Sequence, residues 1–177
     1  MGADKALLEI NGVPLVLRVA REIGKVCGSV TLVGDPGTYQ IPGLAVVPDE
    51  FPGEGPLAGI EAALRCSAAD WNLIVACDMP ALDTAILEFL FTAAMAGPGA
   101  GFGADVALPR YENGQVEPLC GVYHRRCHSV IRAALTAGIR RVTDALQTLA
   151  LIYIPVASTA PFVNLNTPED LRKYQHG

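Results

Sequence analysis

The sequence has no apolar run approaching the roughly 20 residues that a membrane-spanning helix needs, although hydrophobic residues make up 51% of its 177 residues. It also has no stretch that combines a basic start, an apolar centre and a cleavage site, as a secretory signal does. We therefore expect a cytoplasmic protein without a membrane partner. The length and apolar content predict one domain, spanning residues 1–177, with a single sizeable core.

Clusters of basic residues are missing as well. The chain has 13 Lys and Arg against 18 Asp and Glu, a formal net charge of −5. Because a nucleic-acid surface requires a basic patch or stripe, we expect no nucleic-acid partner.

Cysteine motifs are scarce. The five cysteines form no Cys-x-x-Cys pair, and their odd number argues against a disulfide framework. Cys120, His124, Cys127 and His128 lie within nine residues, but they lack the usual spacing of zinc ligands. Buried thiols and surface histidines are the favoured interpretation, and a zinc site is the alternative.

The strongest positive feature is an apolar run at 72–76 that leads into Asp78, with Pro80 preventing the strand from continuing. This pattern predicts a central strand of a parallel sheet, buried on both faces. Ligands of open α/β sheets gather at the carboxyl ends of such strands. Asp78 is therefore a candidate functional carboxylate, and a turn or helix-capping role is the alternative.

The remaining pattern alternates between strands and helices. Helices are expected near 15–24, 56–64, 83–96 and 126–137, in a shorter segment after Arg141 that ends at Leu149, and after Thr167; strands are expected near 30–33, 44–47, 106–108, 116–123 and 151–154. Thr167 and Pro168 have the residue types of an N-cap and a first helical position. Alternation of this kind predicts an α/β fold with a mostly parallel sheet.

Six short motifs, in this order, resemble the molybdenum cofactor guanylyltransferase family: Gly2-Ala3-Asp4-Lys5, Asn11-Gly12-Val13-Pro14-Leu15, Gly55-Pro56-Leu57-Ala58-Gly59-Ile60, Cys77-Asp78-Met79-Pro80, Glu117-Pro118-Leu119 and Asn164-Leu165-Asn166-Thr167-Pro168-Glu169. Each is common alone, and their order over almost the whole chain makes the resemblance specific. The related enzymes that use CTP tend to have Gly-Asp-Gln-Pro at the central strand and aspartates in place of Asn164 and Asn166. Both differences favour the guanylyl branch.

The resemblance implies a Rossmann-like nucleotidyltransferase fold with helices on both faces of the sheet. It implies transfer of GMP from GTP to the terminal phosphate of molybdopterin, with release of pyrophosphate. The expected partners are GTP and molybdopterin or the molybdenum cofactor, and molybdoenzyme-maturation proteins are further candidates. Mg²⁺ prefers one or two carboxylates together with phosphate oxygens. Asp78 is therefore the expected catalytic residue and metal ligand, and Lys5 is expected to place a positive charge on the phosphates.

The resemblance also suggests binding residues. Asp49 matches a nucleotide-contacting aspartate, with a turn after Pro48 as the alternative. Gly55 precedes a helix start, where a ligand could approach free backbone N–H groups. Asn164 and Asn166 face the same side of an extended segment and could bind molybdopterin. Arg140 could hold the molybdopterin phosphate, and a solvated helix end is the alternative.

One departure from the family concerns the N-terminal region. The family begins with a strand and a glycine-rich loop, and Met1-Gly2 matches the last two residues of that motif. We therefore expect the sheet to lack its first central strand and the natural protein to extend upstream. Two other functions stay open: a non-catalytic molybdopterin-binding or assembly module, and a nucleotidyltransferase that uses CTP or a sugar phosphate.

Overall fold

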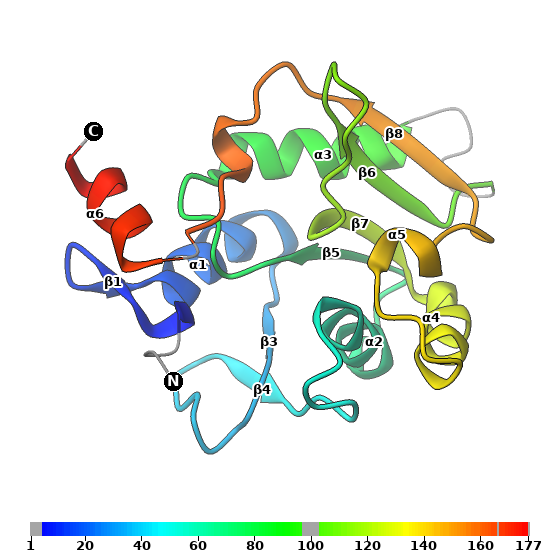
Figure 1. The fold of residues 1–177 in the computed structure, drawn as a ribbon, viewed down its shortest axis with the longest axis horizontal. Helices are drawn as coiled ribbons and strands as arrows, with labels where there is room; N and C mark the ends of the chain where they lie inside the picture. Colours follow the sequence, from blue (N-terminus) through cyan, green and yellow to red (C-terminus); the bar gives the residue numbers. More distant parts are fainter. Residues whose placement is uncertain (1–4, 97–102, 166, 177) are drawn as a thin grey trace.

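The computed structural model describes residues 5–96, 103–165 and 167–176 (Figure 1). In chain order, its elements are η1 (Lys5–Leu7), β1 (Glu9–Ile10), β2 (Val13–Pro14), α1 (Leu15–Cys27), β3 (Thr31–Val33), β4 (Ala45–Val47), α2 (Pro56–Cys66), β5 (Trp71–Val75), α3 (Thr84–Ala96), β6 (Val106–Arg110), β7 (Cys120–His124), η2 (Arg125–Cys127), α4 (His128–Thr136), α5 (Val142–Ala145), β8 (Leu151–Pro155), η3 (Ala160–Phe162) and α6 (Pro168–His176). The predicted α/β class is confirmed. None of the helices in the described part is long and apolar enough to cross a membrane.

The larger sheet has four strands in the order β5-β7-β6-β8. β7 pairs antiparallel with both β5 and β6, whereas β6 and β8 are parallel. β3 and β4 form a separate parallel pair, and β1 and β2 form a small antiparallel hairpin. The larger sheet is therefore mixed, where the sequence predicted a mostly parallel one.

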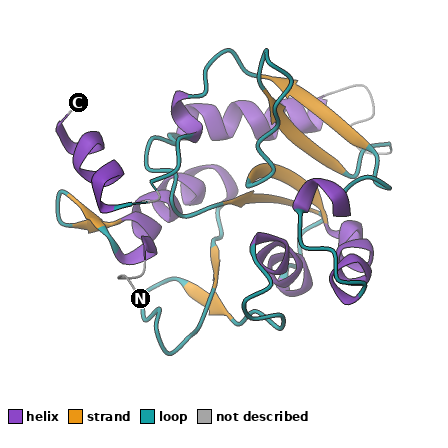
Figure 2. Cartoon of the chain, in the orientation of Figure 1, coloured by secondary structure: helices purple, strands orange, loops and turns teal. Residues whose placement is uncertain are grey.

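Helices cover both faces of this sheet, as Figure 2 shows. The alternation along β6 explains the two layers, because successive side chains of a strand point to opposite faces. Val106 and Leu108 pack with the buried residues of α2, α4 and α5, whereas Ala107 packs with those of α3. The hydrophobic core therefore lies in two layers, one on each side of the sheet.

The prediction that the Asp78 strand is central and buried on both faces is wrong. Among the described strands, β5 lies at the edge of the four-stranded sheet and pairs with β7 alone, and each of its side chains is only partly buried. An apolar run favours burial, but it does not specify which strands lie on either side. Among the described residues, no strand joins β3 to β5, and α2 contacts both of them. This arrangement agrees with the expected gap in the sheet.

The helix ends follow local sequence signals. α1 continues to Cys27, beyond the predicted end near Gly24, and stops where Gly28 adopts a left-handed φ of 69°. At the start of α6, the Thr167 hydroxyl accepts a hydrogen bond from the Asp170 backbone N–H at 3.1 Å. The Asp170 carboxylate in turn accepts one from the Thr167 N–H at 2.8 Å. This reciprocal capping confirms the predicted helix start.

Candidate active site

Asp78 lies just beyond the carboxyl end of β5, between two other segments of the chain. The Ala76 N–H donates to the Leu119 carbonyl at 2.7 Å, and the Leu165 N–H donates to the Asp78 carbonyl at 2.8 Å. One carboxylate oxygen of Asp78, Oδ1, is buried and has no hydrogen-bond partner among the described residues. Buried polar atoms are nearly always paired, so this oxygen is suited to a ligand.

The charges around Asp78 agree with a ligand site. Burial raises the pKa of Asp78, while its own backbone N–H and the positive charge of Lys5 act to lower it. Burial also raises the pKa of Glu117, and the negative charge of Asp78 raises it further. The structure therefore brings Asp78 within electrostatic reach of both Lys5 and Glu117, and the two carboxylates would gain from a shared cation.

Glu117 belongs to one of the sequence motifs, but the sequence assigned it no role. The strand predicted from residue 116 begins only at Cys120, because Glu117-Pro118-Leu119 forms a turn in which the Leu119 N–H donates to the Glu117 carboxylate at 3.3 Å. The hydroxyl of the fully buried Tyr123 donates to the Pro118 carbonyl at 2.6 Å. Tyr123 thus fixes the turn that contains Glu117. In the sequence, Pro118 is the one residue that indicates this turn.

Asn164 joins the same region through its neighbour Leu165, which is hydrogen-bonded to the Asp78 carbonyl. Within the part of the chain that the structure describes, the side-chain oxygen of Asn164 is also buried without a hydrogen-bond partner. We group Lys5, Asp78, Glu117 and Asn164 as the carboxylate site, because Lys5 and Glu117 act electrostatically with Asp78 and the residue after Asn164 is hydrogen-bonded to the Asp78 carbonyl. Asn166 and motif residues 2–4 lie outside the described residues.

Asp49 and Gly55 lie at the two ends of the loop between β4 and α2. The Asp49 carboxylate accepts a hydrogen bond from the Phe51 N–H at 2.7 Å, which is the turn-forming role considered as the alternative. Gly55 caps α2 with a φ of 79°, a conformation that favours glycine, and Pro56 occupies the predicted first helical position. Nucleotide contact by Asp49 and Gly55 stays a prediction.

Arg140 also lies at this loop. Its guanidinium pairs with the Glu54 carboxylate and donates to the Leu135 carbonyl at 2.8 Å. The Arg140 side chain is exposed and caps a carbonyl in the last turn of α4, so the structure agrees with the alternative, a solvated helix end. A contact between Arg140 and molybdopterin stays a prediction.

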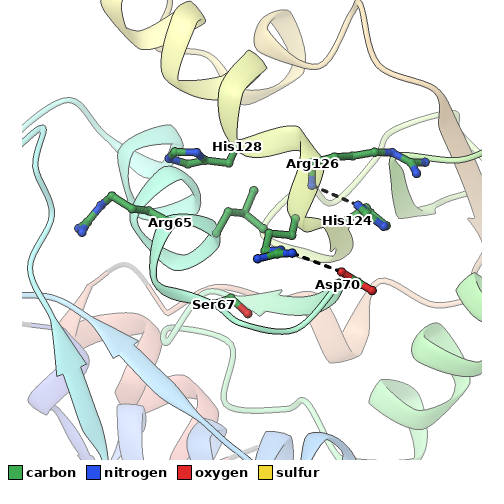
Figure 3. Close-up of a pocket in the computed structure, with 8 residues that line it drawn as sticks. Arg65, Ser67, Asp70, His124, Arg126 and His128 are labelled. Atoms are coloured by element: carbon green, nitrogen blue, oxygen red, sulfur yellow. Dashed lines mark hydrogen bonds and ion pairs between the residues drawn. The ribbon is translucent and has the colours of Figure 1, made fainter.

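A cavity of about 380 Å³ lies at the other end of β5 (Figure 3). It lies beside Asp70, which precedes β5, and His124, which ends β7. Its arginines already have acidic partners: Arg65 with Glu50 and Glu61, Arg125 with Asp70, and Arg126 with Asp105. This cavity is therefore distinct from the carboxylate site, because it lies at the opposite end of β5 and its arginines are already paired with acidic residues.

Solved structures with this fold define the class of protein. The structure of molybdopterin-guanine dinucleotide biosynthesis protein A from Archaeoglobus fulgidus has a TM-score of 0.78 and 26% identity, covering 97% of this chain and 89% of that one. The 2-C-methyl-D-erythritol 4-phosphate cytidylyltransferase from Thermus thermophilus has a TM-score of 0.73 and 17% identity, covering 99% and 93%. At that identity the second match shows the fold alone, which is the nucleotidyltransferase fold.

The family follows from sequence comparison. The family model described as the MobA-like NTP transferase domain matches residues 1–149. A probable molybdenum cofactor guanylyltransferase from Pelotomaculum thermopropionicum is 35% identical over 181 residues, covering 98% of this chain and 84% of that protein. The chain belongs to the MobA-like NTP transferase family.

Proposed function

We propose that this protein transfers GMP from GTP to the terminal phosphate of molybdopterin or the molybdenum cofactor and releases pyrophosphate. Membership of the MobA-like family and the guanylyltransferase relatives support this reaction. The observation that carries the assignment of the site is the buried, unpartnered Oδ1 of Asp78 beside the charge of Lys5. Family and site together favour phosphate chemistry at the end of β5.

The residues of the carboxylate site fit a divalent cation. Asp78 offers a buried oxygen without a hydrogen-bond partner, and Glu117 offers a second carboxylate in electrostatic reach. This set of oxygen donors suits Mg²⁺, which completes its coordination with phosphate oxygens and water. We assign Asp78 and Glu117 as the residues that would hold Mg²⁺. The bound metal would neutralise the triphosphate and stabilise the departing pyrophosphate.

The other residues would bind and orient the two substrates. Lys5 would place its ammonium on the phosphates of GTP, and Asp49 and Gly55 would contact the nucleotide. Asn164 and Asn166 would bind molybdopterin, with Arg140 as a candidate for its phosphate. An oxygen of the acceptor phosphate forms a bond to the α-phosphorus of GTP, and pyrophosphate departs with the electron pair of the broken P–O bond. The reaction needs no covalent enzyme intermediate, so it requires no cysteine nucleophile.

The proposal extends to the surroundings of the reaction. We place it in the cytoplasm, where GTP is available, and propose molybdoenzyme-maturation proteins as recipients of the product.

Pyrophosphate release from GTP or CTP, with molybdopterin present, tests the function. GTP is expected to support turnover, and Asp78→Ala is expected to lower it by on the order of 100-fold or more. Asp70→Asn is the matched control, because Asp70 is exposed and lies at the opposite end of β5. Faster turnover with CTP would overturn the guanylyl assignment. Equal background release by wild type and Asp78→Ala would overturn the catalytic assignment and favour a binding module.

A further inference from the structure

A second cavity, of about 390 Å³, lies between α1, the segment 80–83 and α6. Two arginines of α1, Arg18 and Arg21, line it together with Tyr174 of α6. The Tyr174 hydroxyl donates to the Pro80 carbonyl at 3.3 Å, which joins α6 to the segment that follows Asp78. Figure 1 shows α1 lying between the end of β5 and α6. Pro80, two residues after Asp78, is therefore one of the residues that line this cavity.

The arginines of this cavity have no acidic partner. In the described part of the chain, neither Arg18 nor Arg21 forms an ion pair, and the Nε of Arg18 is buried without a hydrogen-bond partner. A buried donor without a partner is rare in proteins, so this Nε is suited to an acceptor that binds in the cavity. Because a guanidinium remains charged, an anion is the ligand that fits best.

The two acids that line the same cavity are already bound elsewhere. Glu22 accepts hydrogen bonds from the Thr84 N–H at 3.1 Å and hydroxyl at 2.5 Å, and it pairs with Lys25 at 2.6 Å. The hydrogen bonds from Lys25 and Thr84 lower the pKa of Glu22, so it remains ionised. Asp83 accepts from the Ile86 N–H at 2.9 Å. Both carboxylates therefore accept hydrogen bonds from the first turn of α3, and neither forms an ion pair with Arg18 or Arg21 in the described part of the chain.

The cavity in Figure 3 gives a direct contrast within the same molecule. There Arg125 lies 3.7 Å from Asp70, and Arg126 is paired with Asp105. Both cavities contain an arginine whose Nε is buried without a hydrogen-bond partner, Arg18 in one and Arg65 in the other, but only in the cavity beside α1 do the arginines lack an acidic partner within the described residues.

We propose that Arg18 and Arg21 form a binding site for a phosphate group in the cavity between α1, segment 80–83 and α6. A guanidinium offers a planar pair of donors that matches two oxygens of a phosphate. The phosphate could belong to the acceptor substrate or be free inorganic phosphate. The substrate assignment rests on the proposed function, whereas phosphate binding itself does not.

Calorimetric titration of the full chain with inorganic phosphate at low ionic strength tests the site directly. Arg18→Gln and Arg21→Gln are each expected to weaken phosphate binding by about tenfold or more, since each removes a charge-assisted contact. Arg125→Gln is the control and is expected to bind as wild type does. Asp78→Ala is also expected to bind phosphate normally, so loss of turnover and loss of this site are distinguishable.

Kinetics with molybdopterin distinguish the two sources of phosphate. An increase in KM for molybdopterin of about tenfold in Arg18→Gln, with kcat unchanged, would assign the site to the acceptor substrate. Weaker binding of inorganic phosphate alone would assign it to free phosphate. Unchanged binding of both ligands in folded Arg18→Gln and Arg21→Gln, checked by circular dichroism, would overturn the proposal.

Discussion

The Asp78 carboxyl links protonation to folding and, in the proposed function, to metal binding. Its pKa is raised above the ordinary value because burial disfavours the charged form. The folded protein therefore binds a proton at Asp78 more tightly than the unfolded chain does. As pH rises from the ordinary pKa through the raised one, this residue lowers stability. A bound cation would reverse the effect by stabilising the charged carboxylate.

Asp78→Asn is expected to remove activity and yet stabilise the metal-free protein at neutral pH. The neutral amide has similar size and avoids burying a charge, so we expect a gain of at most about 1 kcal/mol, because the side chain is only partly buried. Thermal unfolding in the presence of a chelator measures this as a higher Tm. Asp70→Asn, at an exposed position, should leave Tm unchanged. A lower Tm for Asp78→Asn would show that the carboxylate stabilises the fold.

Mg²⁺ is expected to stabilise the protein more at neutral than at acidic pH. Protons compete with the cation for Asp78 and Glu117, whose pKa values are both raised by burial. The rise in Tm on adding Mg²⁺ should therefore be greater at about pH 7.5 than at about pH 5. The same measurement on Asp78→Asn should show little effect of Mg²⁺ at either pH. A Tm rise that is independent of pH would contradict carboxylate ligation.

The sequence identified some of these residues and missed others for a physical reason. Asp78 was recognisable because it follows an apolar strand, and Asn164 because it belongs to a motif. The role of Glu117 depends on the antiparallel pairing of β5 with β7, which brings Leu119 against Ala76. The role of Arg140 depends on Glu54, a partner far away in the sequence. Neither contact leaves a local signal.

At the scale of elements, a buried carboxylate joins α2 to α4. Glu61 of α2 is fully buried and accepts from Arg132 of α4 at 2.6 Å, with His128 at 2.9 Å. Arg132 also contacts Glu50 at 3.0 Å, and its guanidinium lies 5.4 Å from the centre of the Phe51 ring. Arg132 therefore connects α4 both to α2 and to the loop that contains Asp49.

Arg132→Met is expected to destabilise the protein, and to do so more than the control below, because it removes a cationic partner of the fully buried Glu61 carboxylate. Denaturation in urea measures the free energy of unfolding. Arg125→Met is the matched control, since the exposed pair of Arg125 and Asp70 should contribute at most about 0.5 kcal/mol.

A double-mutant cycle tests whether the effect passes through Glu61. Replacing Glu61 by Gln should cost less in the Arg132→Met background than in wild type, because the two side chains are in contact. Strictly additive losses would show that Arg132 acts through Glu50 and Phe51 instead.

Helices were predicted more accurately than strand pairing. The helical periodicity of α2 and the capping residues of α6 are local, and both elements form as expected. The neighbours of β5 are set by contacts between distant segments, so its apolar run does not reveal that the strand lies at an edge and pairs antiparallel. β7 begins at Cys120 and not at residue 116, because residues 117–119 form a turn that contains Pro118. The residue pattern alone does not distinguish this turn from a strand.

At the scale of the whole molecule, the described strands fall into separate sheets, and one edge of β5 has no strand beside it among them. A backbone hydrogen bond joins Ala76 to Leu119, and it determines which backbone N–H groups of β5 point toward β7 and which point away. The Ile74 N–H therefore points toward β7, whereas the N–H groups of Leu73 and Val75 point away from it. Neither Leu73 nor Val75 donates to any other backbone carbonyl in the described part of the chain.

Hydrogen exchange followed by NMR should reveal this edge. The amides of Leu73 and Val75 are expected to exchange on the order of 100-fold faster than that of Ile74, because amides without a structural partner exchange without opening of the sheet. Ala107 and Leu108 of β6 provide the control, since β6 is paired on both sides and both amides should be protected. Equally slow exchange at Leu73 and Ile74 would mean that another strand covers the edge of β5 in solution, and the mixed sheet would then have a neighbour beyond the residues described.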